Sequence, residues 1–330
     1  MHRFERIVGM RKLTKFLAVD CGGTRIKMGL VADRKLVAQH EIDTDCGDTV
    51  QSCLPKIAAH LEKICSDHSC SPSDCDGILL AIPVIVSPDL RTVTRCFGKF
   101  VDAIGFDFVD WAGGRLGLPL LLENDARAAA IAEWDCGAGR GVSNMAMVTL
   151  GTGIGTAVIC EGKPLRGRSG LAGNLGGHTA THVGGEICSC GIDGCLEAQV
   201  ATWALPGLLH KDPEFAGSAL FDEPILDYET LFRHSAEGDR LAGKYTERAL
   251  RGWAALLVNL VHGYDPERIV LGGGIMRQAD STIRPLQELL NRQATLSGGA
   301  VELVPAQIGV SAALLAAPWL FEKKGSFVRA

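Results

Sequence analysis

The sequence predicts an α/β protein of two related lobes, and three observations support this. Short apolar runs that suit buried strands alternate with longer amphipathic stretches, which is typical of α/β folds. A unit of strand, Gly/Thr turn and strand occurs twice, around Asp20–Thr24 and around Gly151–Gly155. A strand followed by Gly272–Gly274 comes near the end of the chain. With 330 residues, 47% of them hydrophobic, the chain can bury two cores of ordinary size.

The first part of the chain is expected to form one sheet with two helices. Helical spacing of apolar residues predicts an amphipathic helix over 50–64. A second helix is expected over 124–134, because Asn124 is a good N-cap and the residues after it are rich in alanine. Continuous apolar runs predict strands over 16–19, 26–31, 36–39, 78–82 and 120–122.

The second part repeats the opening pattern and then becomes helical. Strands are expected over 145–150, 156–160 and 269–271, and a long helix over 239–262 ends before Asp265-Pro266. A helix is expected after the three glycines, and another around 310–320. This order predicts a smaller lobe of residues 15–123 that takes back residues 308–325, and a larger lobe of residues 124–307.

Composition excludes several classes of protein. A net charge of −5 and a pI near 6.0 give no basic footprint for nucleic acid or an anionic membrane. No apolar run approaches the length of a membrane span, and the first residues lack the apolar core of a secretory signal. Either Met1 or Met10 could be the start. Twelve irregularly spaced cysteines favour reduced thiols, so we expect a cytoplasmic protein.

The densest group of potential metal ligands lies just after the middle of the chain. Cys188, Cys190 and Cys195 have C-x-C-x4-C spacing, with His178 ten residues ahead of the first. Three thiolates and one imidazole are the ligand set of a closed, tetrahedral Zn²⁺ site. A disulfide or four unrelated residues are the alternatives. Glu197 follows directly, so a metal here would fix the position of that carboxylate.

Two weaker metal candidates lie elsewhere. Cys65, Cys70 and Cys75 are evenly spaced around His68, but no glycine turns separate them. His182 could compete with His178 for zinc, although the ten-residue spacing to the first cysteine favours His178.

The glycine turns are candidates for phosphate binding. Without side chains, glycines let backbone N–H groups approach phosphate oxygens. Neither turn fits the pattern of a P-loop, and a strand rather than a helix follows Gly155, which excludes a dinucleotide fingerprint. Singly, each could be an ordinary turn. Together with Gly272–Gly274 they favour a nucleotide.

These motifs resemble those of the ROK family (repressor, open reading frame, kinase) of sugar kinases, from about Phe16 to Leu320. The resemblance implies a two-lobed hexokinase/actin-like (ribonuclease H-like) ATPase fold, with a nucleotide and sugar cleft between the lobes. It implies transfer of the γ-phosphoryl of ATP to a hexose hydroxyl with Mg²⁺ and structural Zn²⁺. A glucokinase-type reaction is expected, with an N-acetylhexosamine or fructose kinase as the alternative. A homodimer or homotetramer is also implied.

The resemblance assigns roles to individual residues. In the E-N-D-A motif, Asp125 is the catalytic base and Asn124 binds the sugar, although the pair could also be no more than a helix cap. Glu197 and His178 bind the sugar, and Asp20 is placed to hold Mg²⁺ through water. Zinc is implied at His178, Cys188, Cys190 and Cys195. The nucleotide is implied at Asp20, Gly22, Gly23, Thr24, Gly151, Thr152, Gly153, Gly272, Gly273 and Gly274.

The chain departs from the family pattern where the sugar would bind. The usual G-E-x-G-H reads Gly173–His178, one residue longer, with Asn174 near the place of the glutamate. The usual P-G-x-V reads Pro83–Val86, and Lys99 follows in a segment without the family's Asn-Leu pair. Lys99 could reach the sugar or remain a solvated surface residue. The sequence therefore leaves the identity of the sugar open.

Two other classes of function are alternatives. Repressors of the family carry a helix-turn-helix domain ahead of the first glycine motif, and the 19 residues before Asp20 are too few for one. The second alternative is a sugar-responsive regulator that has lost turnover. Intact Asp20, Asp125 and glycine loops argue against it.

Overall fold

A computed structural model describes residues 14–44, 49–96, 100–294 and 300–327 of the chain. Met1, Met10 and Lys99, singled out above, lie outside these residues. The first sheet has five strands in the order β3-β2-β1-β4-β7. Its strands are β1 (Lys15–Cys21), β2 (Arg25–Ala32), β3 (Lys35–Asp43), β4 (Gly77–Ile82) and β7 (Leu120–Asn124).

The second sheet repeats this plan with the order β10-β9-β8-β11-β12. In each sheet an antiparallel meander comes first, and two strands then join it in parallel. The repeated unit seen in the sequence is therefore a structural repeat. The strands are β8 (Met145–Leu150), β9 (Ile154–Cys160), β10 (Lys163–Pro164), β11 (Arg268–Gly272) and β12 (Glu302–Pro305).

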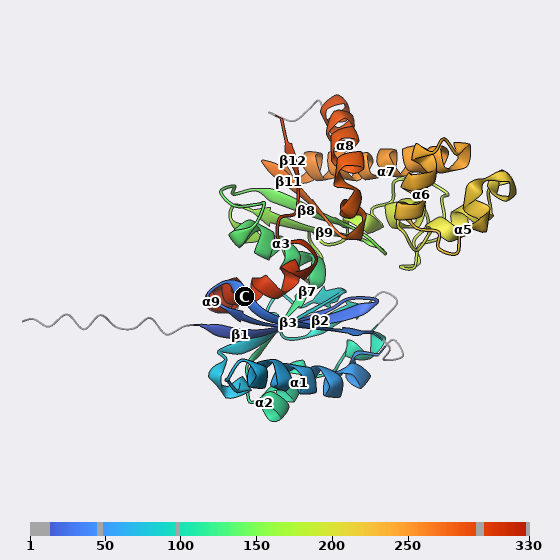
Figure 1. Ribbon diagram of the computed structural model, residues 1–330. Coiled ribbons are helices and arrows are strands. Elements are labelled where there is room, and N and C mark those ends of the chain that lie inside the picture. The colour runs from blue at the N-terminus through green and yellow to red at the C-terminus, as the bar shows by residue number, and fades with distance from the viewer. Residues whose placement is uncertain (1–13, 45–48, 97–99, 295–299, 328–330) are drawn as a thin grey trace, which may run out of the picture.

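Helices cover both sheets (Figure 1). On the first sheet, α1 (Val50–Asp67) and α2 (Phe108–Leu116) lie on the face away from the second lobe. Between the two sheets lies α3 (Asp125–Cys136), which contacts β8 and β9 as well as β4 and β7. The remaining α-helices are α4 (Leu196–Val200), α5 (Leu205–His210), α6 (Tyr228–Ala236), α7 (Arg240–Tyr264), α8 (Ala279–Gln293) and α9 (Ala317–Phe327).

Several short elements complete the chain. A separate two-stranded sheet pairs β5 (Val84–Val86) with β6 (Val93–Cys96). Sequence periodicity did not reveal these strands, α2, α4–α6 or β12, because each is too short to show a pattern. The 3₁₀ turns are η1 (Pro72–Asp74), η2 (Val101–Ala103), η3 (Gly176–His178), η4 (Phe215–Gly217), η5 (Ala219–Asp222), η6 (Gly274–Gln278) and η7 (Gly309–Ala316).

Local sequence explains the elements that position the site. The side chain of Asn124 accepts a hydrogen bond from the backbone N–H of Arg127 (3.0 Å), so α3 starts with the predicted N-cap. Asp239 caps α7 in the same way. The predicted amphipathic helix forms as α1 and buries its apolar face against the first sheet.

The C-terminal segment returns to the first sheet, where Phe321 stacks on Phe16 at 5.1 Å between ring centroids. The helix expected around 310–320 is not one α-helix: Gly309–Ala316 form the 3₁₀ helix η7, and α9 starts at Ala317. Small buried residues of η7 pack on the alanine-rich α3, so the two backbones approach closely. Since α3 touches both sheets, its contacts do not assign it to one lobe. The predicted boundary between the lobes, at residues 123 and 124, therefore remains a prediction.

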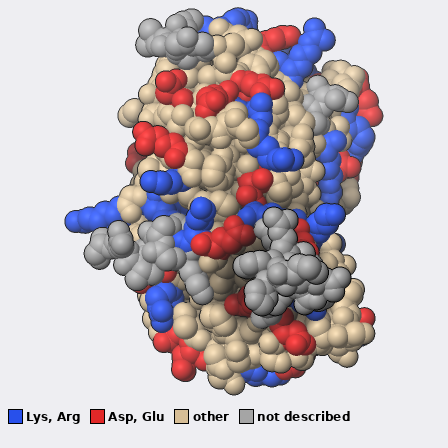
Figure 2. All heavy atoms as spheres, turned by 90° about the vertical axis from the view of Figure 1, so that its left-hand side faces the viewer, with Lys and Arg blue, Asp and Glu red and all other residues tan. Residues whose placement is uncertain are grey.

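The surface fits the composition. Figure 2 shows Lys and Arg side chains interspersed with Asp and Glu over the face it presents, without a broad basic area. Among the described residues, no helix combines the length and apolar character needed to cross a bilayer.

Candidate active site

The E-N-D-A motif lies at the junction of β7 and α3. In register, Asp20 of β1 lies beside Ala81 of β4, which lies beside Glu123 of β7. Since the three strands are parallel, their carboxyl ends meet at one edge of the sheet, where α/β folds bind ligands. This edge therefore brings Asp20 and Asp125 together from positions far apart in the sequence.

The environment of these two carboxyls is unusual. Burial and the nearby Asp125 carboxylate raise the pKa of Asp20 to about 7, although Lys27, whose Nζ lies 4.0 Å from Asp20, acts in the opposite direction. Burial also raises the pKa of Asp125, against hydrogen bonds from the Ala126 N–H (2.8 Å) and the Asn124 amide (3.1 Å) that favour its charged form. Two carboxyls with raised pKa values in one place form a typical cation or proton-transfer site.

Glu123 stabilises this edge of the sheet from the protein interior and is not exposed at its surface. Its fully buried carboxylate accepts hydrogen bonds from Arg166 (2.6 Å), Arg127 (3.2 Å) and the backbone N–H of Asn124 (2.9 Å). Burial alone would raise the pKa of Glu123, but the two arginines outweigh it and hold that pKa below its usual value. The motif therefore combines an ion-paired carboxylate at Glu123 with a carboxyl two residues later, at Asp125, whose pKa is raised. The sequence alone did not reveal this ionic group.

The second glycine turn and the Gly272–Gly274 motif meet at the edge of the second sheet. Gly273 has φ +94°, and a Cβ there would lie 2.2 Å from the carbonyl oxygen of Leu150, so only glycine fits. Gly151, Thr152 and Gly274 line one cavity of about 190 Å³. Its other walls come from Tyr228, Phe232, Gln278 and neighbouring residues of α6 and η6, which no local motif marked.

The first glycine motif does not line that cavity among the described residues. In it, the Gly22 N–H donates to the carbonyl of Arg25 (2.9 Å), which closes the turn between β1 and β2. A Cβ on Gly23 would meet nothing within 4 Å, so this glycine faces open space. Thr24 is exposed beside it. Gly23 and Thr24 of this motif are thus exposed at the turn between β1 and β2.

Glu197 connects the second glycine turn to the cysteine cluster. Its carboxylate accepts hydrogen bonds from the Ile154 N–H (2.8 Å) and from the indole N–H of Trp203 (3.3 Å), a residue that the sequence did not indicate. A Cβ on Gly153 would lie 2.9 Å from Glu197 Oε2, so a larger residue there would displace the Glu197 carboxylate. Glu197 lies two residues after Cys195 in the chain, and its side chain is buried.

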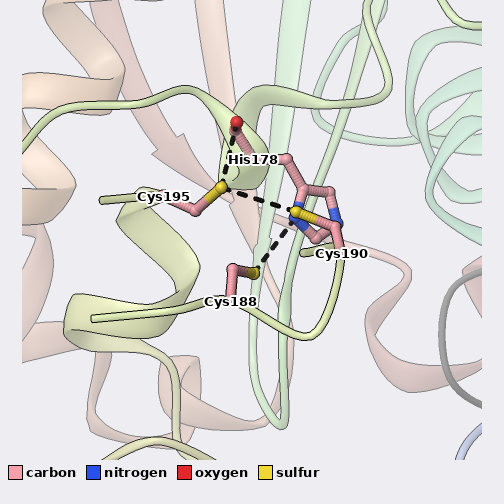
Figure 3. Close-up of side chains that lie close together, drawn as sticks. All are labelled: His178, Cys188, Cys190 and Cys195. Carbon is pink, nitrogen blue, oxygen red and sulfur yellow. Dashed lines mark hydrogen bonds between the residues drawn. The ribbon is translucent and has the colours of Figure 1, made fainter. Parts of the chain in front are cut away.

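His178, Cys188, Cys190 and Cys195 converge, as Figure 3 shows. One potential ligand atom from each lies within 4.8 Å of the others, and they form the sole such group among the described residues. Cys188 Sγ lies 3.5 Å from His178 Nδ1, and Cys190 Sγ lies 3.6 Å from Cys195 Sγ. All three thiols are free. A tetrahedron with zinc–sulfur bonds of about 2.3 Å has edges of about 3.8 Å, so these four atoms fit a zinc ion.

The two weaker metal candidates are not gathered in this way. The described structure contains no group of that compactness around Cys65, Cys70 and Cys75 or including His182. His182 instead supports the loop, since its carbonyl accepts a hydrogen bond from the Gly185 N–H (3.1 Å).

Asn174 has an unusual position for an amide. Its side chain is only 7% exposed, and neither its Oδ1 nor its Nδ2 has a hydrogen-bond partner in the described part of the chain. Leaving a buried polar group unpaired costs about 1–3 kcal/mol. Asn174 lies in the loop that leads to His178. An unsatisfied amide there is a candidate for ligand contact.

Comparison with known proteins shows which family this chain is similar to. The ROK family model matches residues 16–324. The glucokinase of Halalkalibacterium halodurans is 31% identical over 319 residues, which cover 94% of this chain and 95% of that protein. The N-acetylmannosamine kinase of Yersinia pestis is 30% identical over 296 residues, or 89% of this chain and 92% of that protein.

A solved structure shows the same architecture. The ROK family glucokinase from Streptomyces griseus, in complex with glucose and AMPPNP, superposes with a TM-score of 0.78 at 27% identity, covering 93% of this chain and 98% of that one. The two-lobed hexokinase/actin-like fold expected from the sequence is thereby confirmed. On the family match, the similarity over nearly full length and the shared fold, this chain belongs to the ROK family.

Proposed function

We propose that this protein is an ATP-dependent sugar kinase that transfers the γ-phosphoryl of ATP to a hexose hydroxyl. The observation that carries the proposal is the meeting of Asp125 with Asp20 at one sheet edge, where burial and the Asp125 charge together raise the pKa of Asp20. Phosphoryl transfer needs alignment, charge neutralisation and removal of one proton; Asp20 would hold the Mg²⁺ that neutralises charge, and Asp125 can remove the proton.

The acceptor side is assigned to the residues around Asp125. Asp125 takes the proton of the attacking hydroxyl, while Asn124, His178 and Glu197 hold other hydroxyls of the sugar. Support for this comes from the fixed position of Glu197 between Ile154 and Trp203, and from the Asn124 amide, which orients the Asp125 carboxylate.

The donor side is assigned to the glycine motifs. The cavity of about 190 Å³ would hold the base and ribose of ATP against Tyr228 and Phe232. Backbone N–H groups of Thr152 and Gly153, with those of Gly23 and Thr24, would contact the phosphates, while Gly22 and Gly151 close the two turns. Gly272–Gly274 would lie beside the adenosine. Bound Mg²⁺ would neutralise phosphate charge next to Asp20, which suits a cation that keeps several waters.

Zinc is proposed at His178, Cys188, Cys190 and Cys195, because the donor set and the spacing of the four atoms fit it. There it would tie the loop that bears Asn174 to the start of α4, which bears Glu197.

The sugar is proposed to be glucose, with an N-acetylhexosamine or fructose as the alternative. Relatives with names of both kinds are similar to this chain to almost the same degree. A kinase assay over glucose, mannose, fructose, allose, N-acetylglucosamine and N-acetylmannosamine decides between them. If the protein binds a sugar but neither hydrolyses ATP nor transfers phosphate to any of these sugars, a sugar-responsive regulator would be favoured instead. The proposed assembly as a homodimer or homotetramer rests on the family resemblance, and the proposed cytoplasmic location rests on the irregularly spaced cysteines.

Asn174→Ala should raise the KM for the preferred sugar about five- to tenfold and leave kcat nearly unchanged. A neutral hydrogen bond contributes about 1 kcal/mol. The amide has no hydrogen-bond partner within the described part of the chain, so the variant should melt at the same temperature as the wild type or higher. Steady-state kinetics and thermal melting of the apoprotein test this. A lower melting temperature with an unchanged KM would show that Asn174 has only a structural role.

Activity should fall as the pH is lowered through about 7 when Mg²⁺ is limiting. Asp20 and Asp125 act as carboxylates, and burial raises the pKa of each, that of Asp20 to about 7. Turnover is therefore retained above these pKa values and lost below them. A cation favours the ionised form, so saturating Mg²⁺ should move the midpoint to lower pH. Rates from about pH 5.5 to 8.5 at two Mg²⁺ concentrations measure this. A midpoint that does not respond to Mg²⁺ would contradict the assignment of Asp20.

A further inference from the structure

A second and larger cavity lies in the lobe of the second sheet. It has a volume of about 620 Å³, which is in the range of small-molecule sites, about 300–1,000 Å³. The loop Arg166–Gly176 forms one wall, and the C-terminal part of α7 from Leu256 to Tyr264 forms the other. None of the residues assigned above to the sugar, ATP, Mg²⁺ or zinc lines it. The cavity therefore does not include the assigned residues, although Asn174 lies between its lining residues Gly173 and Leu175.

The lining of this cavity is basic. It includes Arg166 and Arg168 together with the polar side chains of Ser169, Asn259 and Tyr264, and it contains no aspartate or glutamate. This is notable in a chain whose net charge is −5. Arg168 is exposed and has no hydrogen-bond or ion-pair partner among the described residues. Its guanidinium, with five N–H donors in a planar fork, suits a phosphate or carboxylate.

Arg166 connects the cavity to the E-N-D-A motif. It lines the cavity and also donates to Glu123 Oε2 (2.6 Å), while Glu123 Oε1 accepts from the N–H of Asn124 (2.9 Å). Arg127, the second partner of Glu123, donates to the carbonyls of Gly170 (2.8 Å) and Ala172 (3.1 Å) in the cavity wall. A single buried carboxylate thus joins the wall of the cavity to the residue before the proposed base.

We propose that this cavity binds a small organic anion, with its phosphate or carboxylate on Arg166 and Arg168, and that its occupancy changes turnover at Asp125. An anion on the cavity side competes with Glu123 for the charge of Arg166. It thereby alters the hydrogen bond that Glu123 makes to Asn124, and the coupling must be reciprocal. The binding site stands on the cavity and its charge, while the effect on turnover rests on the proposed function.

Isothermal titration calorimetry tests binding, with the active site blocked by saturating preferred sugar and a non-hydrolysable ATP analogue. The probes are inorganic phosphate, a hexose 6-phosphate and citrate, which separate phosphate from carboxylate recognition. We expect saturable binding of one anion per chain. Arg168→Gln should weaken it at least about tenfold, as expected for a lost charge-assisted hydrogen bond. Arg91→Gln, an exposed arginine between β5 and β6 of the other lobe, is the matched control and should bind normally.

Three results would overturn the proposal. The first is no saturable binding to the wild type, and the second is equal weakening in both variants, which would indicate nonspecific attraction. The third is a change of sedimentation in Arg168→Gln without a change in anion binding, which would make the cavity an interface between two copies of the chain. The coupling is tested by the kcat of wild type and Arg168→Gln at rising phosphate; equal curves would refute it. A protein inactive on every sugar would refute the kinase proposal and leave the binding result intact.

Discussion

Replacing Asp125 by asparagine is expected to lower kcat by at least about 10²-fold, because the variant lacks the group that removes the proton of the sugar hydroxyl. Binding of ATP and sugar should be retained, since the amide is nearly isosteric and its oxygen can still accept from the Ala126 N–H. Single-turnover kinetics with saturating substrates, together with separate binding measurements, distinguish the chemical step from affinity.

The same substitution should not destabilise the fold. Burial raises the pKa of Asp125, so the folded state holds its proton more tightly than the unfolded chain does. Ionisation at neutral pH therefore costs stability, which the neutral amide recovers. Asp135→Asn, at the other end of α3, removes a carboxylate that pairs with Arg34 and is the control. It should keep its kcat. A near-normal kcat in Asp125→Asn would show that Asp125 serves only to cap the start of α3.

Replacing Cys190 by serine is expected to remove zinc and most of the activity. The purified wild type should carry one zinc per chain, with no disulfide among the three cysteines, as elemental analysis and thiol titration after unfolding with a chelator would show. Losing one thiolate opens the coordination shell, and the free energy of metal binding is then lost to the fold. The melting temperature should fall accordingly.

Activity should fall with it, because the cluster anchors two proposed sugar ligands. His178 is itself in the cluster, and its carbonyl accepts from Cys195 Sγ (3.3 Å), while Glu197 belongs to the helix that starts after Cys195. Cys160→Ser, which alters a free thiol at the end of β9, is the control and should keep its zinc. Active, undamaged wild-type enzyme without zinc would rule out the metal site.

Local sequence was sufficient for the repeated strand and turn units, the cap at Asn124, and the cysteine cluster. Each depends on residues close together in the chain. The strands β1, β4, β8 and β11 are buried on both faces of their sheets and are therefore continuous hydrophobic runs. Such runs can be recognised in the sequence without knowledge of the neighbouring strands. The spacing of the cysteines similarly restricts which atoms can converge on one ion.

Only the tertiary structure showed how Glu123 is used and which residues complete the ligand cavities. Glu123 and Asp125 are neighbours in one motif, yet Arg166, from a distant loop, neutralises the first and leaves the second to its raised pKa. Tyr228 and Phe232 reach the glycine loops only because α6 packs beside η6. Residue type sets what a side chain can do, whereas burial and distant charges decide its protonation and its partners. Those depend on contacts between segments that are remote in sequence.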